Sequence, residues 1–288
     1  MKGMHGMVEA IDRSEAQRIL DSPDLIAIGV RADDVRREMH GSRTTFVRVF
    51  EIHVDAAPAA LPSRVSAGEF RIVGRPASAE AAVAAVRAAA THANGVPVTG
   101  FSLADLHALG QDAFPAFCRA LRDAGLDGIA EVAVDLLDSD SAPAIAQARA
   151  CGLGVRRLTV QAPAADRIAI VLRARELQET AGGFRAFAPL PRQPSIAAPS
   201  TGYDDVRSVA IARLLATGIE SIQVDWPLYG PKLAQFALTV GADDVDGVAA
   251  VDSGTLGTRR SPIEEIRGNI RAAGLDPAER NARYELVG

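Results

Sequence analysis

The chain has 288 residues, of which 48% are hydrophobic and 23% charged, with a formal net charge of −5. These values fit a globular protein with a sizeable core, and they exclude a general nucleic-acid binder, which would carry a basic stripe. No apolar run is long enough to cross a bilayer. The first residues have no apolar segment typical of a secretory signal, so we expect a cytoplasmic protein with no nucleic-acid or membrane partner.

The N-terminal residues predict two helices before the first strand. Ser14 precedes one helical pattern and Ser22, followed by proline, precedes another, so both serines are predicted N-caps. Gly41 is a predicted helix stop. We therefore predict a helical segment over 1–43, packed on a domain that occupies 44–288 and includes a C-terminal extension.

From residue 44 onward, strand-like and helix-like runs alternate. Eight runs are rich in β-branched and apolar residues, namely 44–54, 70–73, 96–101, 129–137, 155–162, 184–190, 221–226 and 246–251. Helical patterns follow most of them, at 78–93, 103–124, 140–151, 164–180, 204–217, 231–240 and 262–273. Alternation of this kind predicts parallel strands with right-handed crossovers.

Eight such units favour an α/β fold of the (β/α)8 TIM-barrel type, with a doubly wound open sheet as the alternative. The first two strands are an irregular place in this pattern. The connection "APAALPSRVSAG" (57–68) is short and contains two prolines, so it does not predict a crossover helix.

Several stretches resemble a known family. These are "DLIAIGVRADDVRREMHGSRTTFV" (24–47), "VTGFSLADLHALG" (98–110) and, above all, "GPKLAQFALTVGADDVDG" (230–247). They resemble the radical SAM enzymes of the futalosine route to menaquinone, aminofutalosine synthase and dehypoxanthine futalosine cyclase, and the related FO synthases. The resemblance implies a barrel with its active site at the carboxyl ends of the strands.

The resemblance also implies a CxxxCxxC motif after the first strand, whose three thiolates hold a [4Fe–4S] cluster that binds S-adenosylmethionine. This chain has two cysteines, Cys118 and Cys151, and neither lies in the loop that directly follows the first strand. Iron–sulfur sites need thiolate ligands. We therefore predict no iron–sulfur cluster, no other metal and no binding of S-adenosylmethionine.

A second departure falls near the fourth strand. Where the family carries a glycine-rich turn ending in a glutamate, this chain reads "LDGIAEVAVDLL" (126–137), with Glu131 among the replaced glycines and Asp135 where the glutamate would be. Side chains then fill a place where backbone approached a ligand closely. Two losses together favour a chain adapted to work without cofactor cleavage.

Polar residues at the predicted strand ends are the candidate catalytic groups. His53 and Asp55 alternate on one face at the end of the first strand, where they can form a general acid–base pair or merely satisfy a hydrogen bond at the rim. Asp135 ends the fourth strand and is the third catalytic candidate, while Gln161 ends the fifth strand and is a candidate substrate-binding residue; either residue can instead be structural.

The candidate substrate-binding residues come from the last three strands and their loops. Arg192, followed by Gln193, can clamp a carboxylate or phosphate, or can be a solvated loop residue. Trp226 can stack on a substrate ring or belong to the core. The resemblance adds Tyr229 and Lys232, and it implies that Asp243, Asp244 and Asp246 shape the barrel mouth and contact substrate hydroxyls.

Two functions remain open from the sequence. The first is a barrel that has lost its cluster and binds a small molecule related to the futalosine route, with a non-redox lyase or transferase activity as one outcome. The second is a non-catalytic pseudoenzyme that pairs with an active radical SAM paralogue. A homodimer is a further expected assembly.

Overall fold

The structure is a computed structural model that describes residues 11–56, 60–62, 65–164, 166–193, 201–251 and 262–287. Its strands are β1 (Arg43–His53), β2 (Glu69–Val73), β3 (Val98–Ser102), β4 (Leu126–Ala133), β5 (Gly154–Val155), β6 (Arg157–Val160), β7 (Ala186–Pro191), β8 (Ser221–Asp225), β9 (Asp244–Ala249) and β10 (Asp276–Glu279). Its helices are α1 (Arg13–Asp21), α2 (Leu25–His40), α3 (Ala79–Ala93), α4 (Leu103–Gly110), α5 (Phe114–Ala124), α6 (Ser141–Ala150), α7 (Arg167–Ala181), α8 (Gly202–Leu215), α9 (Trp226–Leu238) and α10 (Pro262–Ala272).

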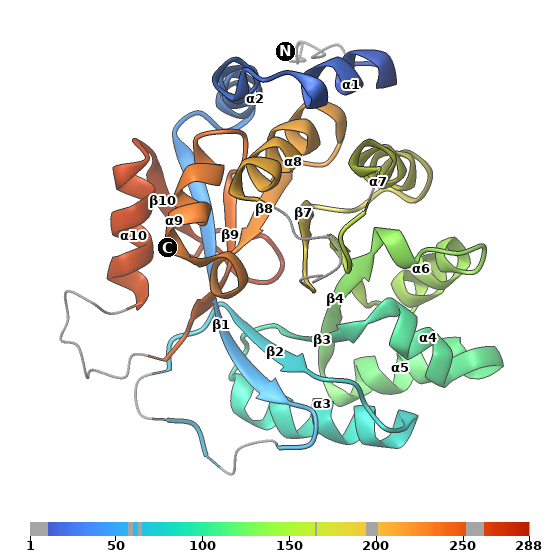
Figure 1. Cartoon of the computed structure of the whole chain (residues 1–288). Coiled ribbons are helices and arrows are strands. Elements are labelled where there is room, and N and C mark those ends of the chain that lie inside the picture. The colour runs from blue at the N-terminus through green and yellow to red at the C-terminus, as the bar shows by residue number, and fades with distance from the viewer. Residues whose placement is uncertain are drawn as a thin grey trace, which may run out of the picture.

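The sheet closes into a barrel of eight parallel strands. Neighbours follow the order β1-β2-β3-β4-β6-β7-β8-β9, and β9 pairs with β1 to close the ring. Helices surround the strands (Figure 1). The predicted (β/α)8 fold is thus confirmed, and an open doubly wound sheet is excluded by the β1–β9 pairing.

The connection between β1 and β2 is irregular, as the sequence predicts. β1 and β2 pair in parallel, from Val49 with Glu69 to His53 with Val73. Between them, the residues that the structure describes contain no helix. The first residues of β1 lie beyond the reach of β2. There β10 pairs with the edge of β1 that β2 pairs with further along, so the C-terminal segment completes the barrel wall.

Carboxylates rather than serines cap the two N-terminal helices. Asp12 accepts a hydrogen bond from the Glu15 amide at 2.7 Å, and Asp24 accepts one from the Ala27 amide at 3.0 Å. The prediction of Ser14 and Ser22 as caps is wrong, because an aspartate at the N-cap of each helix takes this role instead. The helix stop at Gly41, with φ of 63°, is confirmed.

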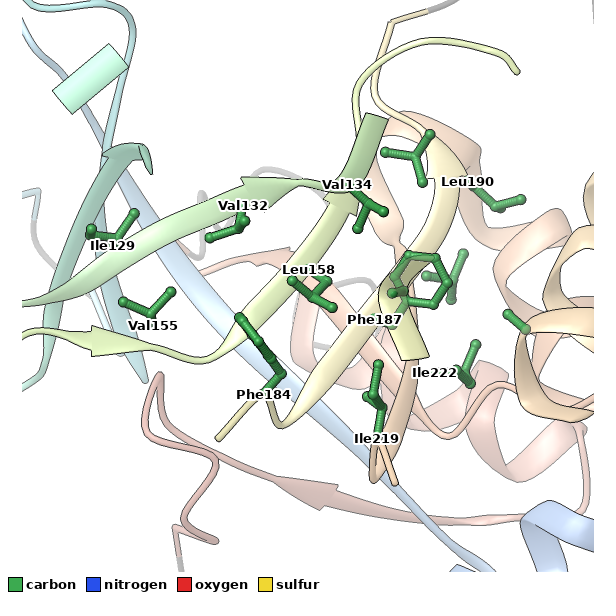
Figure 2. Close-up of a cluster of buried hydrophobic side chains, with 14 of the residues drawn as sticks. Ile129, Val132, Val134, Val155, Leu158, Phe184, Phe187, Leu190, Ile219 and Ile222 are labelled. Carbon is green, nitrogen blue, oxygen red and sulfur yellow. The ribbon is translucent and has the colours of Figure 1, made fainter. Parts of the chain in front are cut away.

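The hydrophobic core lies between the barrel wall and the helices. Leu158 on β6 and Phe187 on β7 are paired neighbours that point into this layer, where Val132 and Ile222 join them (Figure 2). All are 2% exposed or less. These apolar residues of β4, β6, β7 and β8 therefore serve the outer layer, and the residues that alternate with them, such as Arg157 and Gln223, face the inside of the barrel.

α1 and α2 pack against the helices that surround the barrel, and His40 at the end of α2 also reaches the amino ends of the strands, where its Nε2 lies 2.9 Å from the Glu220 carbonyl. α2 packs along α8, and α1 contacts both α7 and α8 (Figure 1). The division of the chain at residue 43 into a helical segment and a barrel stays a prediction. Among the described residues, no helix combines the length and the apolar character needed to cross a bilayer.

Candidate functional site

Two adjacent strands turn carboxylates into the barrel. β8 carries Gln223 and Asp225 around a valine, and β9 carries Asp244 and Asp246 around a valine, with Asp225 paired to Asp246 across the two strands. Because side chains alternate between the two faces of a strand, these polar residues share the inner face. Their side chains define three levels of an ion network along the barrel axis.

The level at the amino ends of the strands is built on Asp244. Arg280 from the C-terminal segment donates to it from Nε and Nη2, both at 2.6 Å, and Gln223 donates at 2.6 Å. The Arg280 guanidinium also stacks on the Tyr284 ring, 4.1 Å from its centre. These contacts close the amino-terminal end of the barrel with residues of the chain itself.

The middle level is built on Asp246. Arg71 donates to it at 2.7 and 2.9 Å and to Glu69 at 2.7 and 2.8 Å, while Arg157 forms a further ion pair with Asp246. Burial opposes ionisation of Asp246, but the charges of Arg157 and Arg71 outweigh it, so its pKa lies well below the usual range. The pKa of Glu69 is lowered in the same way, against burial, by Arg71.

The upper level faces the carboxyl ends of the strands and is built on Arg192. Its Nε lies 3.0 Å from a Glu131 oxygen and its Nη1 lies 3.4 Å from an Asp225 oxygen. Glu131 comes from β4, Arg192 follows β7 and Asp225 ends β8, so three strands converge here. Arg192 and Glu131 are about a quarter exposed, which makes this level the accessible end of the network.

The network holds one more acid than base. Its carboxylates are Glu69, Glu131, Asp225, Asp244 and Asp246, and its guanidiniums are those of Arg71, Arg157, Arg192 and Arg280. The pKa of Asp225 is raised, first by burial and then by the negative charge of Asp246, with Arg192 opposing both. The Asp225 carboxyl therefore retains a proton to higher pH than an ordinary aspartate does.

His53 and Asp55 lie close together, as the sequence predicts. The His53 Nδ1 lies 3.9 Å from the Asp55 Oδ2 at the end of β1, and both side chains are more than half exposed. No ion pair links them to the upper level among the described residues. Their role as an acid–base pair stays a prediction.

Asp135 and Gln161 are also brought together. The Asp135 carboxylate accepts hydrogen bonds from the backbone amides of Gln161 at 2.8 Å and Ala162 at 2.9 Å, which ties the end of β4 to the end of β6. The Gln193 amide donates to the Gln161 carbonyl at 2.9 Å. These contacts position the rim of the barrel beside Arg192.

The residues of α9 divide between the site and the surface. Trp226 begins the helix directly after Asp225 and packs partly against the core. The Tyr229 hydroxyl donates to the Pro191 carbonyl at 2.5 Å, one residue before Arg192, and burial raises its pKa. Lys232 is exposed beyond the kink at Gly230.

The three aspartates of "GADDVDG" do not lie together at the barrel mouth. β9 begins at Asp244, two residues before the predicted strand, so Asp243 and Asp244 sit at its amino end and Asp246 in the middle. Asp243 forms a buried ion pair with Arg213 of α8 and lies 3.4 Å from His40 of α2. It joins these helices to the barrel. Contacts of these aspartates with a substrate stay a prediction.

The sequence reasoning missed Asp225 and did not place Glu131 in the site. The signal for Asp225 was present, since "QVD" at 223–225 and "DVD" at 244–246 show the same polar-apolar-polar alternation. To predict that these two acidic strands lie side by side with their carboxylates facing inward, the pairing register of the strands would have to be known.

The two cysteines do not fit a cluster held by three thiolates. Cys118 is buried in α5, where burial raises its pKa to about 12, and Cys151 ends α6 with its Sγ 3.3 Å from the Pro115 carbonyl. Both belong to the outer helical layer. The described residues at the end of β1 include exposed His53 and Asp55, neither of which is a thiolate.

The family model described as "CofH/MqnC C-terminal region" matches residues 183–288. Aminodeoxyfutalosine synthase of Streptomyces coelicolor is 34% identical over 42% of this chain and 37% of that protein. Cyclic dehypoxanthine futalosine synthase of the same organism is 32% identical over 58% of this chain and 48% of that protein. The chain thus spans less than two thirds of the length of these relatives.

Solved structures show the same fold. Methylornithine synthase (PylB) superposes with a TM-score of 0.65 at 15% identity, covering 93% of this chain and 94% of that chain. The hydrogenase maturase HydG from Carboxydothermus hydrogenoformans gives 0.66 at 12% identity, covering 96% and 78%. The sequence relatives confirm the family resemblance drawn from the sequence, and the solved structures confirm the barrel fold alone.

Proposed function

From the homology of this chain to the radical SAM enzymes of futalosine-route menaquinone biosynthesis, we propose that it is a barrel that works without a [4Fe–4S] cluster or cleavage of S-adenosylmethionine. It binds a small molecule related to that route at the carboxyl ends of its strands. The activity compatible with this site is a non-redox lyase or transferase reaction assisted by a carboxyl group.

The ion triad of Glu131, Arg192 and Asp225 is the observation that carries the proposal. It stands at the carboxyl ends of β4, β7 and β8, the face on which barrel enzymes of this kind bind their substrates. The three side chains are held by their own ion pairs, since Arg192 contacts both Glu131 and Asp225. Glu131 itself stands where the family has a glycine-rich turn.

The absence of a thiolate set supports the loss of the cluster. Soft iron–sulfur sites select cysteine ligands, and oxygen ligands do not replace them. With two cysteines in the whole sequence, both in the outer helices, the chain cannot supply three thiolates to one cluster.

Asp225 is the residue that we assign to proton transfer. Its raised pKa keeps a larger fraction of the carboxyl protonated than an exposed aspartate would. Arg192, 3.4 Å away, holds the carboxyl in place and offers its remaining donors to an acceptor on the ligand. Asp225 then gives or takes a proton at the bound molecule.

The first experiment combines iron analysis with a thermal-shift screen. Protein purified without oxygen, incubated with iron and sulfide and then separated from the unbound reagents should be colourless and free of iron. The screen would contain S-adenosylmethionine, aminodeoxyfutalosine, dehypoxanthine futalosine, adenosine and an aromatic carboxylate. A ligand at a hundred times its dissociation constant stabilises the fold by about 2.7 kcal/mol, a shift of several degrees.

Arg192→Leu and Arg185→Leu are a matched pair for this screen. Arg185 lies just before β7, at the opposite end of the barrel, in an exposed pair with Glu220 at 2.7 Å. The shift should disappear in Arg192→Leu and persist in Arg185→Leu. A protein that takes up close to one cluster per chain, or a shift produced by S-adenosylmethionine alone, would overturn the proposal.

A second candidate function is that of a non-catalytic partner subunit. Ile26 and Val30 lie one turn apart on α2 and are 80% and 54% exposed, which is unusual for a helix that packs on a barrel. Co-purification with an aminodeoxyfutalosine synthase from the same cell, lost in Ile26→Glu, would favour this function. A monomer by light scattering, with no co-purified synthase, would exclude it.

A further inference from the structure

The peptide group that precedes Arg192 is held from two sides. Its carbonyl, that of Pro191, accepts a hydrogen bond from the Tyr229 hydroxyl at 2.5 Å, and its N–H, that of Arg192, donates to the Val160 carbonyl at 2.9 Å. The two contacts come from different elements, since Tyr229 belongs to α9 and Val160 ends β6. This peptide group cannot rotate without losing a hydrogen bond, so the backbone before Arg192 is held in one orientation.

Asp135 holds the end of β6 on which Arg192 depends. Its two carboxylate oxygens accept from the amides of Gln161 and Ala162 at 2.8 and 2.9 Å. These amides belong to the same two peptide groups whose carbonyls accept from Arg192 and Gln193, each at 2.9 Å. One carboxylate at the end of β4 therefore orients both peptide groups that bond the backbone around Arg192.

Tyr229 belongs to the helical turn that Asp225 begins. Asp225 caps α9 by accepting from the Leu228 amide at 3.0 Å, and Tyr229 is the next residue of that turn. Tyr229 thus links the turn that carries the Asp225 carboxyl to the backbone from which Arg192 extends. The Arg192 Nη1 lies 3.4 Å from the Asp225 carboxylate across this link.

We infer that Tyr229 and Asp135 are positioning residues of the barrel site, which hold the backbone around Arg192 and so set its guanidinium between Glu131 and Asp225. A functional side chain keeps its geometry when hydrogen bonds from neighbouring residues support it. The inference rests on the proposed function, because it concerns the same ion triad. It assigns roles to two residues that act through Arg192.

The pKa of Asp225 reports the position of Arg192 without any ligand. Burial and the charge of Asp246 raise this pKa, whereas the guanidiniums of Arg192 and, from β2, Arg71 lower it. Carbon NMR of protein isotopically labelled at the aspartate carboxyl measures the pKa, and Asp225→Asn identifies the signal by its disappearance. Arg192→Leu gives the pKa that Asp225 has without the guanidinium.

Tyr229→Phe removes the hydroxyl, keeps the ring and changes no charge, because burial raises the pKa of Tyr229 and keeps it neutral throughout the titration. We expect the pKa of Asp225 to rise in this variant, toward its value in Arg192→Leu. Tyr203→Phe is the matched control. Tyr203 is 72% exposed on α8, so its variant should leave the pKa of Asp225 unchanged.

In Asp135→Asn, charge and positioning act in opposite directions. Loss of a negative charge by itself would lower the pKa of Asp225, whereas displacement of Arg192 raises it. We expect a rise, because asparagine has one acceptor oxygen for the two backbone amides and turns a donor toward the other. Asp138→Asn is the control with the same loss of charge, since Asp138 bonds only the Ser141 hydroxyl and the Asp140 amide among the described residues, and it should produce no rise.

A melting curve for each variant establishes that the comparison is between folded proteins. A purely structural role would lower the melting temperature and leave the pKa of Asp225 as in wild type. An unchanged or lowered pKa in folded Tyr229→Phe or folded Asp135→Asn would therefore refute the positioning role of that residue.

The outcome is separate from that of the proposed function. If the ligand screen succeeds but neither variant raises the pKa of Asp225, the inference is wrong and the function stands. Uptake of a cluster by the protein would overturn the function, whereas a raised pKa in both variants would still support the inference about Arg192.

Discussion

Replacement of Asp246 by asparagine tests the ion network most directly. Asp246 is 1% exposed and is the carboxylate shared by Arg71 and Arg157. Asparagine keeps the volume and one acceptor but removes the charge, which leaves two buried guanidiniums with less compensation. Removal of one partner of a buried ion pair costs about 3–5 kcal/mol.

The structure indicates the lower end of that range. Arg71 keeps its two hydrogen bonds to Glu69 at 2.7 and 2.8 Å, so the loss falls mainly on Arg157, which retains the Ala130 carbonyl at 2.9 Å. We therefore expect Asp246→Asn to lower the free energy of unfolding by about 3 kcal/mol. The melting temperature should fall by roughly 6–12 °C, at 2–4 °C per kcal/mol.

The assay is urea unfolding at 25 °C followed by circular dichroism. Glu264→Gln is the control, since its pair with Arg267 at 3.3 Å is exposed and should change stability by less than about 0.5 kcal/mol. The double variant Asp246→Leu, Arg157→Met replaces the pair by apolar groups and should recover part of the loss. A loss below about 1 kcal/mol in Asp246→Asn would refute the reasoning, because it would mean that the guanidiniums do not depend on this carboxylate.

Three further outcomes follow from individual residues. The pKa of Asp225 is higher in the folded protein, so the protonated carboxyl contributes to stability at low pH, and this contribution is lost as pH rises through the folded pKa. The stability of Asp225→Asn relative to wild type should therefore improve between pH 4 and 7. A difference in stability that does not change with pH would contradict the raised pKa. Cys151 should react with a thiol reagent well before Cys118, whose buried thiol has a pKa of about 12; equal rates by mass spectrometry would argue against that burial. Gly68→Ala should destabilise the fold by about 1–3 kcal/mol, because the new Cβ would lie 2.5 Å from the Arg280 carbonyl oxygen. Gly268→Ala on α10 is the control: its Cβ meets no atom within 4 Å, so it should stabilise the fold by about 0.5–1 kcal/mol in the same urea unfolding assay.

The sequence by itself determined the class of fold and much of its segmentation. Alanine-rich helices with a cap, such as α3 with Ser78, and β-branched strands between them are local signals, because caps and side-chain periods depend on neighbours in the chain. The prolines after residue 56 likewise predicted that β1 and β2 are joined without a regular crossover helix. The count of cysteines also needed no structure.

Only the tertiary structure decided how the charges inside the barrel are paired. Arg71 meets Asp246 across 175 residues of chain, and Arg192 meets Glu131 from a strand two places along the ring. Side-chain direction alternates along a strand, so a shift of one or two residues in a predicted start changes which groups face inward or at which level they lie. For the "DDVD" cluster, the family resemblance implied a place at one mouth, while the register of β9 distributes the aspartates from the base to the middle of the barrel. Local patterns fix the elements, but closure of the ring fixes the site.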